Sequence, residues 1–213
     1  MGRSPVQSRL SAPDGLTVFE TMRSDAGRVA LWPRHLARLE RGCAAVGFPL
    51  DAGRVAAVMD ALPGGVLRAR LAVDRGGQVA LTHAALPDNP PEWRVMVADQ
   101  RLRSDDPWLR IKTTHRPAYD AARASLPDGV DEAVLLNEHG QICEGSITNV
   151  FVPDGDRLLT PPLSCGVLPG VLRAELLATG RAVETVLTPG DLAGRFFCGN
   201  ALRGLIPARL VGA

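Results

Sequence analysis

The chain contains 24 basic residues, and only one of them, Lys112, is a lysine. Arginine serves as well as lysine for solubility and often better for pairing with anions, so a single retained lysine suggests a task that a guanidinium cannot perform. Imine formation is such a task, because an amine with a lowered pKa loses its proton and attacks a carbonyl, whereas a guanidinium stays charged. Composition alone leaves open that Lys112 is a chance remnant.

Two other segments offer groups that pyridoxal phosphate (PLP) would require: a carboxylate beside the pyridine nitrogen and a site for the phosphate. Glu144 lies just past a predicted strand in Glu144-Gly145-Ser146, where a glycine lets the backbone approach a ligand. The predicted helix start at Pro169-Gly170-Val171-Leu172 offers backbone N–H groups and the positive end of a helix dipole to an anion. Taken singly, Glu144 could equally be a solvated loop acid, and most helix starts bind nothing.

Net charge and composition exclude several other kinds of partner. A formal net charge of +1, with 46% hydrophobic and 22% charged residues, gives no basic field for nucleic acid or anionic lipid. No apolar run approaches the roughly 20 residues needed to span a bilayer, and residues 1–12 lack the apolar core of a signal peptide. We therefore expect a cytoplasmic protein that acts on a small molecule.

The cysteines and histidines are too scattered to predict a metal site. No pair of cysteines has C-x-x-C spacing and no pair of histidines has H-x-x-x-H spacing, so we assign no metal and expect free, mostly buried thiols. The residues concerned are Cys43, Cys143, Cys165 and Cys198, with His35, His83, His115 and His139.

The first part of the chain predicts a strand, two helices and a hairpin. Residues 17–23 alternate as a strand, and a helix with Pro33 in its first turn ends at Gly47. Asp51 is a suitable N-cap for a second helix. In the hairpin of residues 66–73 and 78–83, Arg68 and Arg70 are expected on the face opposite the apolar side chains.

Residues 86–92 contain three prolines and are predicted to link two domains, 1–85 and 93–213. The second half predicts a helix after Pro117, another helix after Pro169, and short strands near residues 94–98, 132–136, 141–144, 148–152, 157–160 and 196–198. Hairpins and helices without regular alternation indicate an α+β fold of two domains, a small one and a larger one that carries Lys112.

These segments resemble, in the same order, those of the class IV aminotransferase-like PLP proteins (fold type IV), over nearly the whole chain. The matching segments are Phe19-Glu20-Thr21-Met22-Arg23, His35-Leu36-Ala37-Arg38-Leu39, Lys112-Thr113-Thr114-His115-Arg116, residues 131–137, residues 144–151, and Gly166-Val167-Leu168-Pro169-Gly170-Val171. The resemblance implies a two-domain fold like that of D-amino acid aminotransferase, with the cofactor between the domains, and a homodimer.

The resemblance also implies roles for individual residues. Lys112 would hold PLP as a Schiff base, and Glu144 would hold the pyridine nitrogen protonated. Arg38 and the N–H groups of Gly170, Val171 and Leu172 would bind the phosphate, with Asn200 nearby.

Within this family, the segments 112–114, 160–170 and 200–204 look most like those of the 4-amino-4-deoxychorismate lyases, and Thr21 falls at the position of a threonine that assists the lyase reaction. The implied reaction gives 4-aminobenzoate and pyruvate on the route to folate. Two alternatives stay open: an aminotransferase for branched-chain or D-amino acids, and a non-catalytic binding module of the same fold.

The sequence departs from the lyase pattern on the substrate side. In longer family members a Gly-rich segment with a further arginine near the substrate follows Arg75-Gly76-Gly77, whereas here residues 78–83 follow at once. Tyr119 could be either a site or a core residue. Substrate carboxylates still need cations, and the candidates are Arg23, Arg70, Arg75, Arg116 and Arg203.

Overall fold

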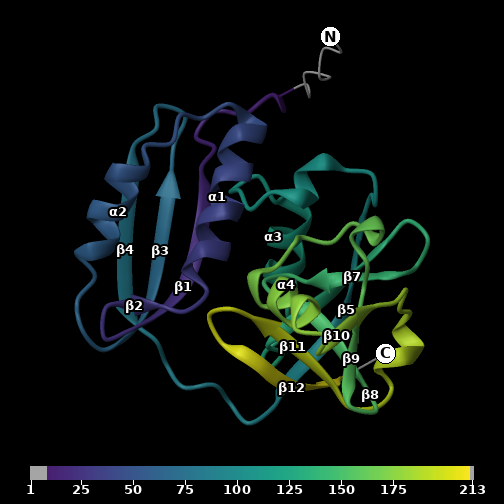
Figure 1. The fold of residues 1–213 in the computed structure, drawn as a ribbon. Coiled ribbons are helices and arrows are strands. Elements are labelled where there is room, and N and C mark those ends of the chain that lie inside the picture. Colours follow the sequence, from purple (N-terminus) through teal and green to yellow (C-terminus); the bar gives the residue numbers. More distant parts are fainter. Residues whose placement is uncertain (1–8, 212–213) are drawn as a thin grey trace.

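The computed structural model describes residues 9–211, so the outer ends of the two predicted domains, residues 1–8 and 212–213, lie outside the described residues. The chain forms two sheets that come from separate stretches of sequence, one before and one after the predicted linker (Figure 1). This arrangement agrees with an α+β fold. The separation of the sheets does not test whether each half folds as a unit by itself. The division into domains 1–85 and 93–213 therefore stays a prediction.

The first sheet is antiparallel and has the order β2-β1-β3-β4. Its strands are β1 (Val18–Asp25), β2 (Arg28–Val29), β3 (Val66–Val73) and β4 (Val79–Ala85), and its helices are α1 (Trp32–Val46) and α2 (Ala52–Asp60). Alternate residues of β3, namely Ala69, Leu71 and Val73, are buried in a core shared with the two helices. Arg68 and Arg70 face the other way, as the alternation predicts.

The predicted ends of both helices are confirmed. Gly47 follows α1 with φ +75°, a left-handed conformation that costs glycine little. The side chain of Asp51 accepts a hydrogen bond of 3.1 Å from the N–H of Arg54 at the start of α2. The buried face of α1 carries His35 and Arg38.

The second sheet is mixed and has the order β10-β9-β8-β11-β12-β5-β6-β7. Its strands are β5 (Trp93–Leu102), β6 (Glu132–Asn137), β7 (Ile142–Gly145), β8 (Asn149–Asp154), β9 (Arg157–Thr160), β10 (Ala182–Glu184), β11 (Phe196–Asn200) and β12 (Gly204–Leu210). The helices are α3 (Pro117–Ala124) and α4 (Val171–Ala178), with three 3-10 turns at Pro107–Arg110, Leu163–Cys165 and Pro189–Leu192. All four cysteines are buried and free, as expected.

Two strands of this sheet were not predicted. β12 pairs with β11 on one side and with β5 on the other, although it contains Pro207, which lacks the N–H that a central strand normally donates. β10 pairs in parallel with β9 and is only three residues long, which is too short for an alternation of apolar and polar residues to be visible in the sequence.

The segment that carries Lys112 connects the two sheets. Phe19 of β1 donates its N–H to the carbonyl of Lys112 at 3.0 Å, and Thr114 donates its N–H to the carbonyl of Thr17 at the same distance. Lys112 is thus held in extended backbone against the edge of the first sheet, after the 3-10 turn at Pro107–Arg110. Among residues 9–211, no helix is both long enough and apolar enough to cross a membrane.

Candidate active site

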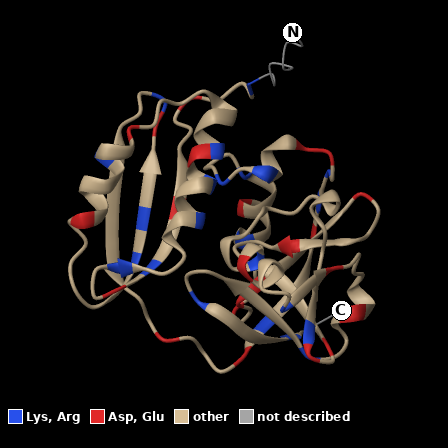
Figure 2. Ribbon diagram, viewed as in Figure 1, with Lys and Arg blue, Asp and Glu red and all other residues tan. Residues whose placement is uncertain are grey.

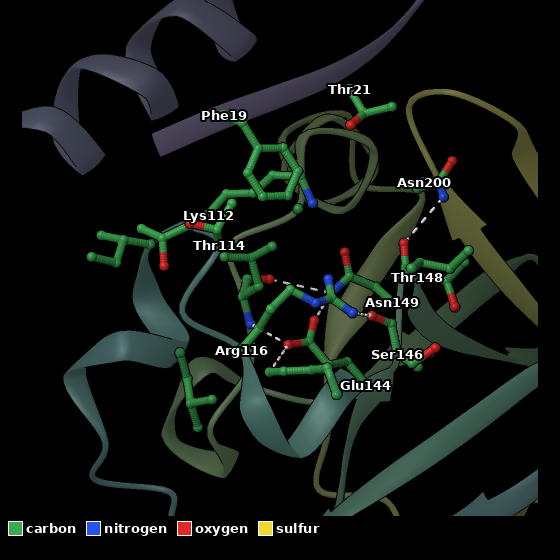
Figure 3. Close-up of a pocket in the computed structure, with 18 of the residues that line it drawn as sticks. Phe19, Thr21, Lys112, Thr114, Arg116, Glu144, Ser146, Thr148, Asn149 and Asn200 are labelled. Atoms are coloured by element: carbon green, nitrogen blue, oxygen red, sulfur yellow. Dashed lines mark hydrogen bonds between the residues drawn. The ribbon is translucent and has the colours of Figure 1, made fainter. Parts of the chain in front are cut away.

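A cavity of about 650 Å³ lies between the two sheets and is lined by side chains from both. The first sheet and α1 contribute Phe19, Thr21 and Arg38, and the second half of the chain contributes Lys112 and Glu144 (Figure 3). Four separate segments of the chain therefore meet at one place.

The amine of Lys112 lies in this cavity, 4.8 Å from the centre of the Phe19 ring. Burial disfavours the charged ammonium, and the nearby cations Arg38 and Arg116 add to this effect. Glu20 and Glu144 partly oppose it. The net result is that the pKa of Lys112 falls from 10.5 to about 8, which makes the neutral, nucleophilic amine accessible near physiological pH.

Glu144 is buried at the end of β7 and accepts three hydrogen bonds. They come from the Tyr119 hydroxyl at 2.6 Å, the Asn149 amide at 3.1 Å and the Leu168 backbone N–H at 3.1 Å. Burial raises the pKa of Glu144 to about 7, although the bonds from Tyr119 and Leu168, together with the Lys112 charge, act in the opposite direction. A cationic partner placed beside Glu144 would favour its carboxylate form further.

Tyr119, which the sequence left as either a site or a core residue, is a partner of Glu144. Its ring projects from α3 with the Arg116 guanidinium 5.1 Å from its centre, and it lines the cavity. Burial and the Glu144 charge raise the pKa of Tyr119 well above 10, so the hydroxyl stays protonated and acts as a donor. Tyr119 thereby fixes the position of the Glu144 carboxyl group.

Arg38 reaches the cavity but is already paired with a residue that the sequence reasoning did not single out, Glu20. Arg38 donates to Glu20 from Nε at 2.7 Å and from Nη2 at 2.6 Å, and His35 Nδ1 lies 2.7 Å from the same carboxylate. Although burial opposes ionisation of Glu20, the Arg38 guanidinium outweighs it and lowers the pKa of Glu20 to about 2. The third nitrogen, Arg38 Nη1, donates to the Pro169 carbonyl just before α4.

The start of α4 faces the same cavity through Gly170 and Val171, whereas Leu172 is not among the residues that line it. The Gly170 N–H already donates to the Leu168 carbonyl at 2.7 Å. Within residues 9–211, the N–H groups of Val171 and Leu172 have no protein acceptor, so these are the groups that the helix start offers to an anion. Gly170 is also required sterically, because a Cβ there would collide with Asn149 Oδ1.

Asn200 lines the cavity but uses its side chain to shape the loop after β11. Its Oδ1 accepts from the N–H groups of Leu202 and Arg203, and its Nδ2 donates to the Ile147 carbonyl at 3.1 Å. Thr21 lies on β1, directly opposite Arg70 of β3, with its side chain in the cavity.

Of the five arginines proposed for substrate carboxylates, Arg70, Arg116 and Arg203 line the cavity. Arg23 and Arg75 are not among its lining residues. Arg68 also lines the cavity. The sequence predicted that Arg68 lies on the same face of its strand as Arg70, but Arg68 was not among the candidates.

Comparison with known proteins decides the family. The family model for amino-transferase class IV matches residues 17–211. The chain belongs to the class IV aminotransferase family. Members of this family depend on PLP, so this class IV protein is a PLP-dependent enzyme with the fold that its sequence predicted.

Individual relatives of this class IV chain have different names. It is 32% identical over 106 residues to the "Probable branched-chain-amino-acid aminotransferase" of Thermotoga maritima, a match that covers 46% of this chain and 38% of that protein. It is 27% identical over 200 residues to the "Aminodeoxychorismate lyase" of Bacillus subtilis, covering 83% of this chain and 68% of that protein. A crystal structure from Mesorhizobium loti, described as a "Putative amino-acid aminotransferase", is 43% identical with a TM-score of 0.87, covering 92% of this chain and all of that one.

The groups in the cavity of this class IV enzyme fit PLP. The amine with the lowered pKa and the buried carboxylate, Lys112 and Glu144, line one cavity with an arginine and a helix start that has unused N–H groups. PLP needs an amine, a carboxylate for its pyridine nitrogen and an anion site, and the groups gathered here are of these three types.

Proposed function

We propose that this enzyme is a lyase that converts 4-amino-4-deoxychorismate into 4-aminobenzoate and pyruvate, a reaction on the route to folate. The observation that carries the proposal is the position of Thr21 and Arg70, which lie side by side in the cavity on neighbouring strands. The substrate carries two carboxylates, and a cavity lined by arginines from both halves of the chain suits them.

Four groups of this chain would hold the cofactor. Lys112 would carry PLP, Glu144 would pair with the pyridine nitrogen, and Arg38 and the N–H groups of Val171 and Leu172 would bind the phosphate. When bound, PLP supplies an electron sink that is conjugated to the substrate amine. Glu144 supports that role because a carboxylate beside the ring nitrogen favours its protonated form.

Lys112 and Thr21 would handle the protons of the reaction. The Lys112 amine takes the proton from the ring carbon that bears the substrate nitrogen, because its pKa of about 8 makes it an effective base near neutral pH. The ring C–O bond then breaks, the enolpyruvyl group leaves and gains a proton to become pyruvate, and the ring becomes aromatic. The Thr21 hydroxyl would orient or relay the proton at the departing oxygen.

The second candidate is an aminotransferase, which the names of the Thermotoga and Mesorhizobium proteins favour. A branched-chain substrate needs an apolar pocket for its side chain. Here Arg68 and Arg70 of β3 face the cavity instead, with the Thr21 hydroxyl beside them. This polar surface is the reason for preferring the lyase.

The test is to incubate the purified enzyme and PLP with 4-amino-4-deoxychorismate in the absence of any keto acid. We expect 4-aminobenzoate and pyruvate in equal amounts. Thr21→Ala should lower kcat by about a hundredfold, as expected for the loss of a group that assists proton transfer, while Thr21→Ser should keep much of the rate.

Thr82→Ala is the matched control, because Thr82 of β4 lies opposite Arg70 on its other side but is not among the cavity residues. It should leave kcat unchanged. Ping-pong transamination of ordinary amino acids, with no aromatic product from 4-amino-4-deoxychorismate, would establish the second candidate instead.

We further propose a homodimer in which the partner subunit helps to close the site. Light scattering of the purified holoenzyme should give twice the mass of the chain. An active monomer would contradict this proposal.

A further inference from the structure

Arg70 occupies an unusual position in the first sheet. It lies in the middle of β3, and its guanidinium carbon is 3.6 Å from the centre of the Phe19 ring on β1. Stacking on the flat face of an aromatic ring restricts the side chain and points its N–H groups in a fixed direction. Figure 3 shows Phe19 beside Lys112, on the side of the cavity formed by β1.

Four other arginines of the cavity have protein partners. Arg38 is paired with Glu20, Arg116 with Asp120 and the Ser146 carbonyl, Arg123 with the Ser146 hydroxyl, and Arg203 with Asn89. Among residues 9–211, Arg70 makes no hydrogen bond or ion pair with any side chain or carbonyl, although it is half-buried. Arg68, two residues away on the same face, likewise has no such partner among these residues, so the donors of both arginines remain available to a ligand.

The charged neighbours of Arg70 are also cations. Burial lowers the pKa of Arg70, and the positive charges of Arg116 and Arg68 lower it further. Figure 2 shows that β3 carries basic residues and no acidic ones. Positive charges that are held close together, with no acidic side chain on the strand to neutralise them, favour the binding of an anion between them.

The Lys112 amine and the Arg70 guanidinium lie near the same aromatic ring. They are 4.8 Å and 3.6 Å, respectively, from the centre of the Phe19 ring. In an α-amino acid the carboxylate is on the carbon that bears the amine, whereas a six-membered ring can carry the two groups at opposite ends.

We propose that Arg70, stacked on Phe19, binds the substrate carboxylate that lies across a six-membered ring from the substrate amine. This assignment rests on the proposed lyase function, because 4-amino-4-deoxychorismate and 4-aminobenzoate both carry the amine and the carboxylate at opposite ends of the ring. Arg70 would then take the place of the substrate-binding arginine whose segment is missing after residue 77.

Binding of two isomers to the holoenzyme tests the geometry without requiring turnover. In 4-aminobenzoate the carboxylate is opposite the amine, whereas in 2-aminobenzoate it is adjacent. We expect the wild-type holoenzyme to bind 4-aminobenzoate more tightly. Arg70→Gln should weaken that binding by tenfold or more, roughly the effect of losing a charge-assisted hydrogen bond, and change binding of 2-aminobenzoate little.

Arg23→Gln is the matched control, since Arg23 lies on the same face of the neighbouring strand and its replacement removes the same charge, but it does not line the cavity. Arg70→Lys keeps the charge without the planar fork and should lose only part of the affinity. The visible absorption of bound PLP and the melting temperature check that each variant is folded.

Equal binding of 4-aminobenzoate by Arg70→Gln and wild type, an equal loss for both isomers, or no preference in the wild type would each overturn the assignment. Turnover separates this result from the proposed function. If the wild type binds 4-aminobenzoate through Arg70 but forms none from 4-amino-4-deoxychorismate, the lyase proposal fails and the carboxylate site stands. If the product forms and Arg70→Gln has an unchanged KM, only the carboxylate site fails.

Discussion

Because Lys112 is the only lysine, its ionisation can be measured directly in the cofactor-free protein. The structure gives its amine a pKa of about 8 rather than 10.5, a difference of roughly 3 kcal/mol against the ammonium form. At pH 7 about one amine in ten would then be uncharged, compared with about one in three thousand for an ordinary lysine. The nucleophile is therefore prepared by its surroundings before any cofactor binds.

The assay is trace acetylation by acetic anhydride as a function of pH, with the extent at Lys112 read by mass spectrometry. The midpoint should lie near pH 8 in the folded protein and near 10.5 in denaturant. Arg116→Gln removes a cation that repels the ammonium, so it should raise the midpoint by roughly half a unit to one unit. Glu144→Gln removes an anion that attracts the ammonium, so it should lower the midpoint.

Arg209→Gln is the control, because Arg209 is exposed and paired with Glu92 at 2.7 Å, and it is not one of the charges that act on Lys112. It should leave the midpoint in place. A folded-state midpoint near 10.5, or shifts of the same sign in Arg116→Gln and Glu144→Gln, would refute this account of the electrostatics.

Three further variants test the cofactor site. Borohydride should fix PLP to the peptide that contains Lys112, and Lys112→Ala should abolish both this labelling and turnover; retained turnover would remove Lys112 from the mechanism. Tyr119→Phe removes a hydrogen bond that lowers the pKa of Glu144, so the acid limb of the activity profile should move to higher pH; an unmoved limb would mean that Tyr119 only packs. Arg38→Ala should weaken PLP binding in a direct titration and also lower the melting temperature, because it leaves the buried Glu20 without its counterion; unchanged PLP affinity would contradict the phosphate assignment.

Local patterns predicted most of the first sheet and its helices. The alternation over residues 66–73, the glycine at position 47 and the Asp51 cap each depend on neighbours in sequence, and each is observed. β12 was missed for a physical reason: Pro207 argues against a strand locally, and its place between β11 and β5 comes from pairing partners far away in the chain.

The same distinction applies to the site. Lys112 and Glu144 could be selected from the sequence because uniqueness and a glycine-flanked strand end are visible there, and the structure brings both side chains into one cavity. Their cofactor roles stay predictions. The partners that tune them could not be found in this way, because Tyr119 meets Glu144 across 25 residues and Glu20 meets Arg38 across 18.

Glu132 is another residue whose importance depends on tertiary structure. Its fully buried carboxylate accepts hydrogen bonds from the N–H groups of Ser146 and Ile147 and from the Thr148 hydroxyl at 2.9 Å. It thereby holds the loop that follows Glu144. In the sequence it was only the first residue of a predicted strand.

The contacts between α1 and α4 suggest why charged groups rather than apolar ones join the two halves near the cofactor site. Arg38 links the buried Glu20 to the Pro169 carbonyl, and Arg34 pairs with Glu175 at 2.8 Å. Apolar packing tolerates small sliding, whereas a guanidinium held by three oriented hydrogen bonds fixes direction as well as distance. Since the Glu20–Arg38 pair is close to neutral as a whole, most of the attraction for a phosphate must come from the N–H groups at the start of α4. Besides contacting the phosphate, Arg38 would then hold that helix start in place through its bond to the Pro169 carbonyl.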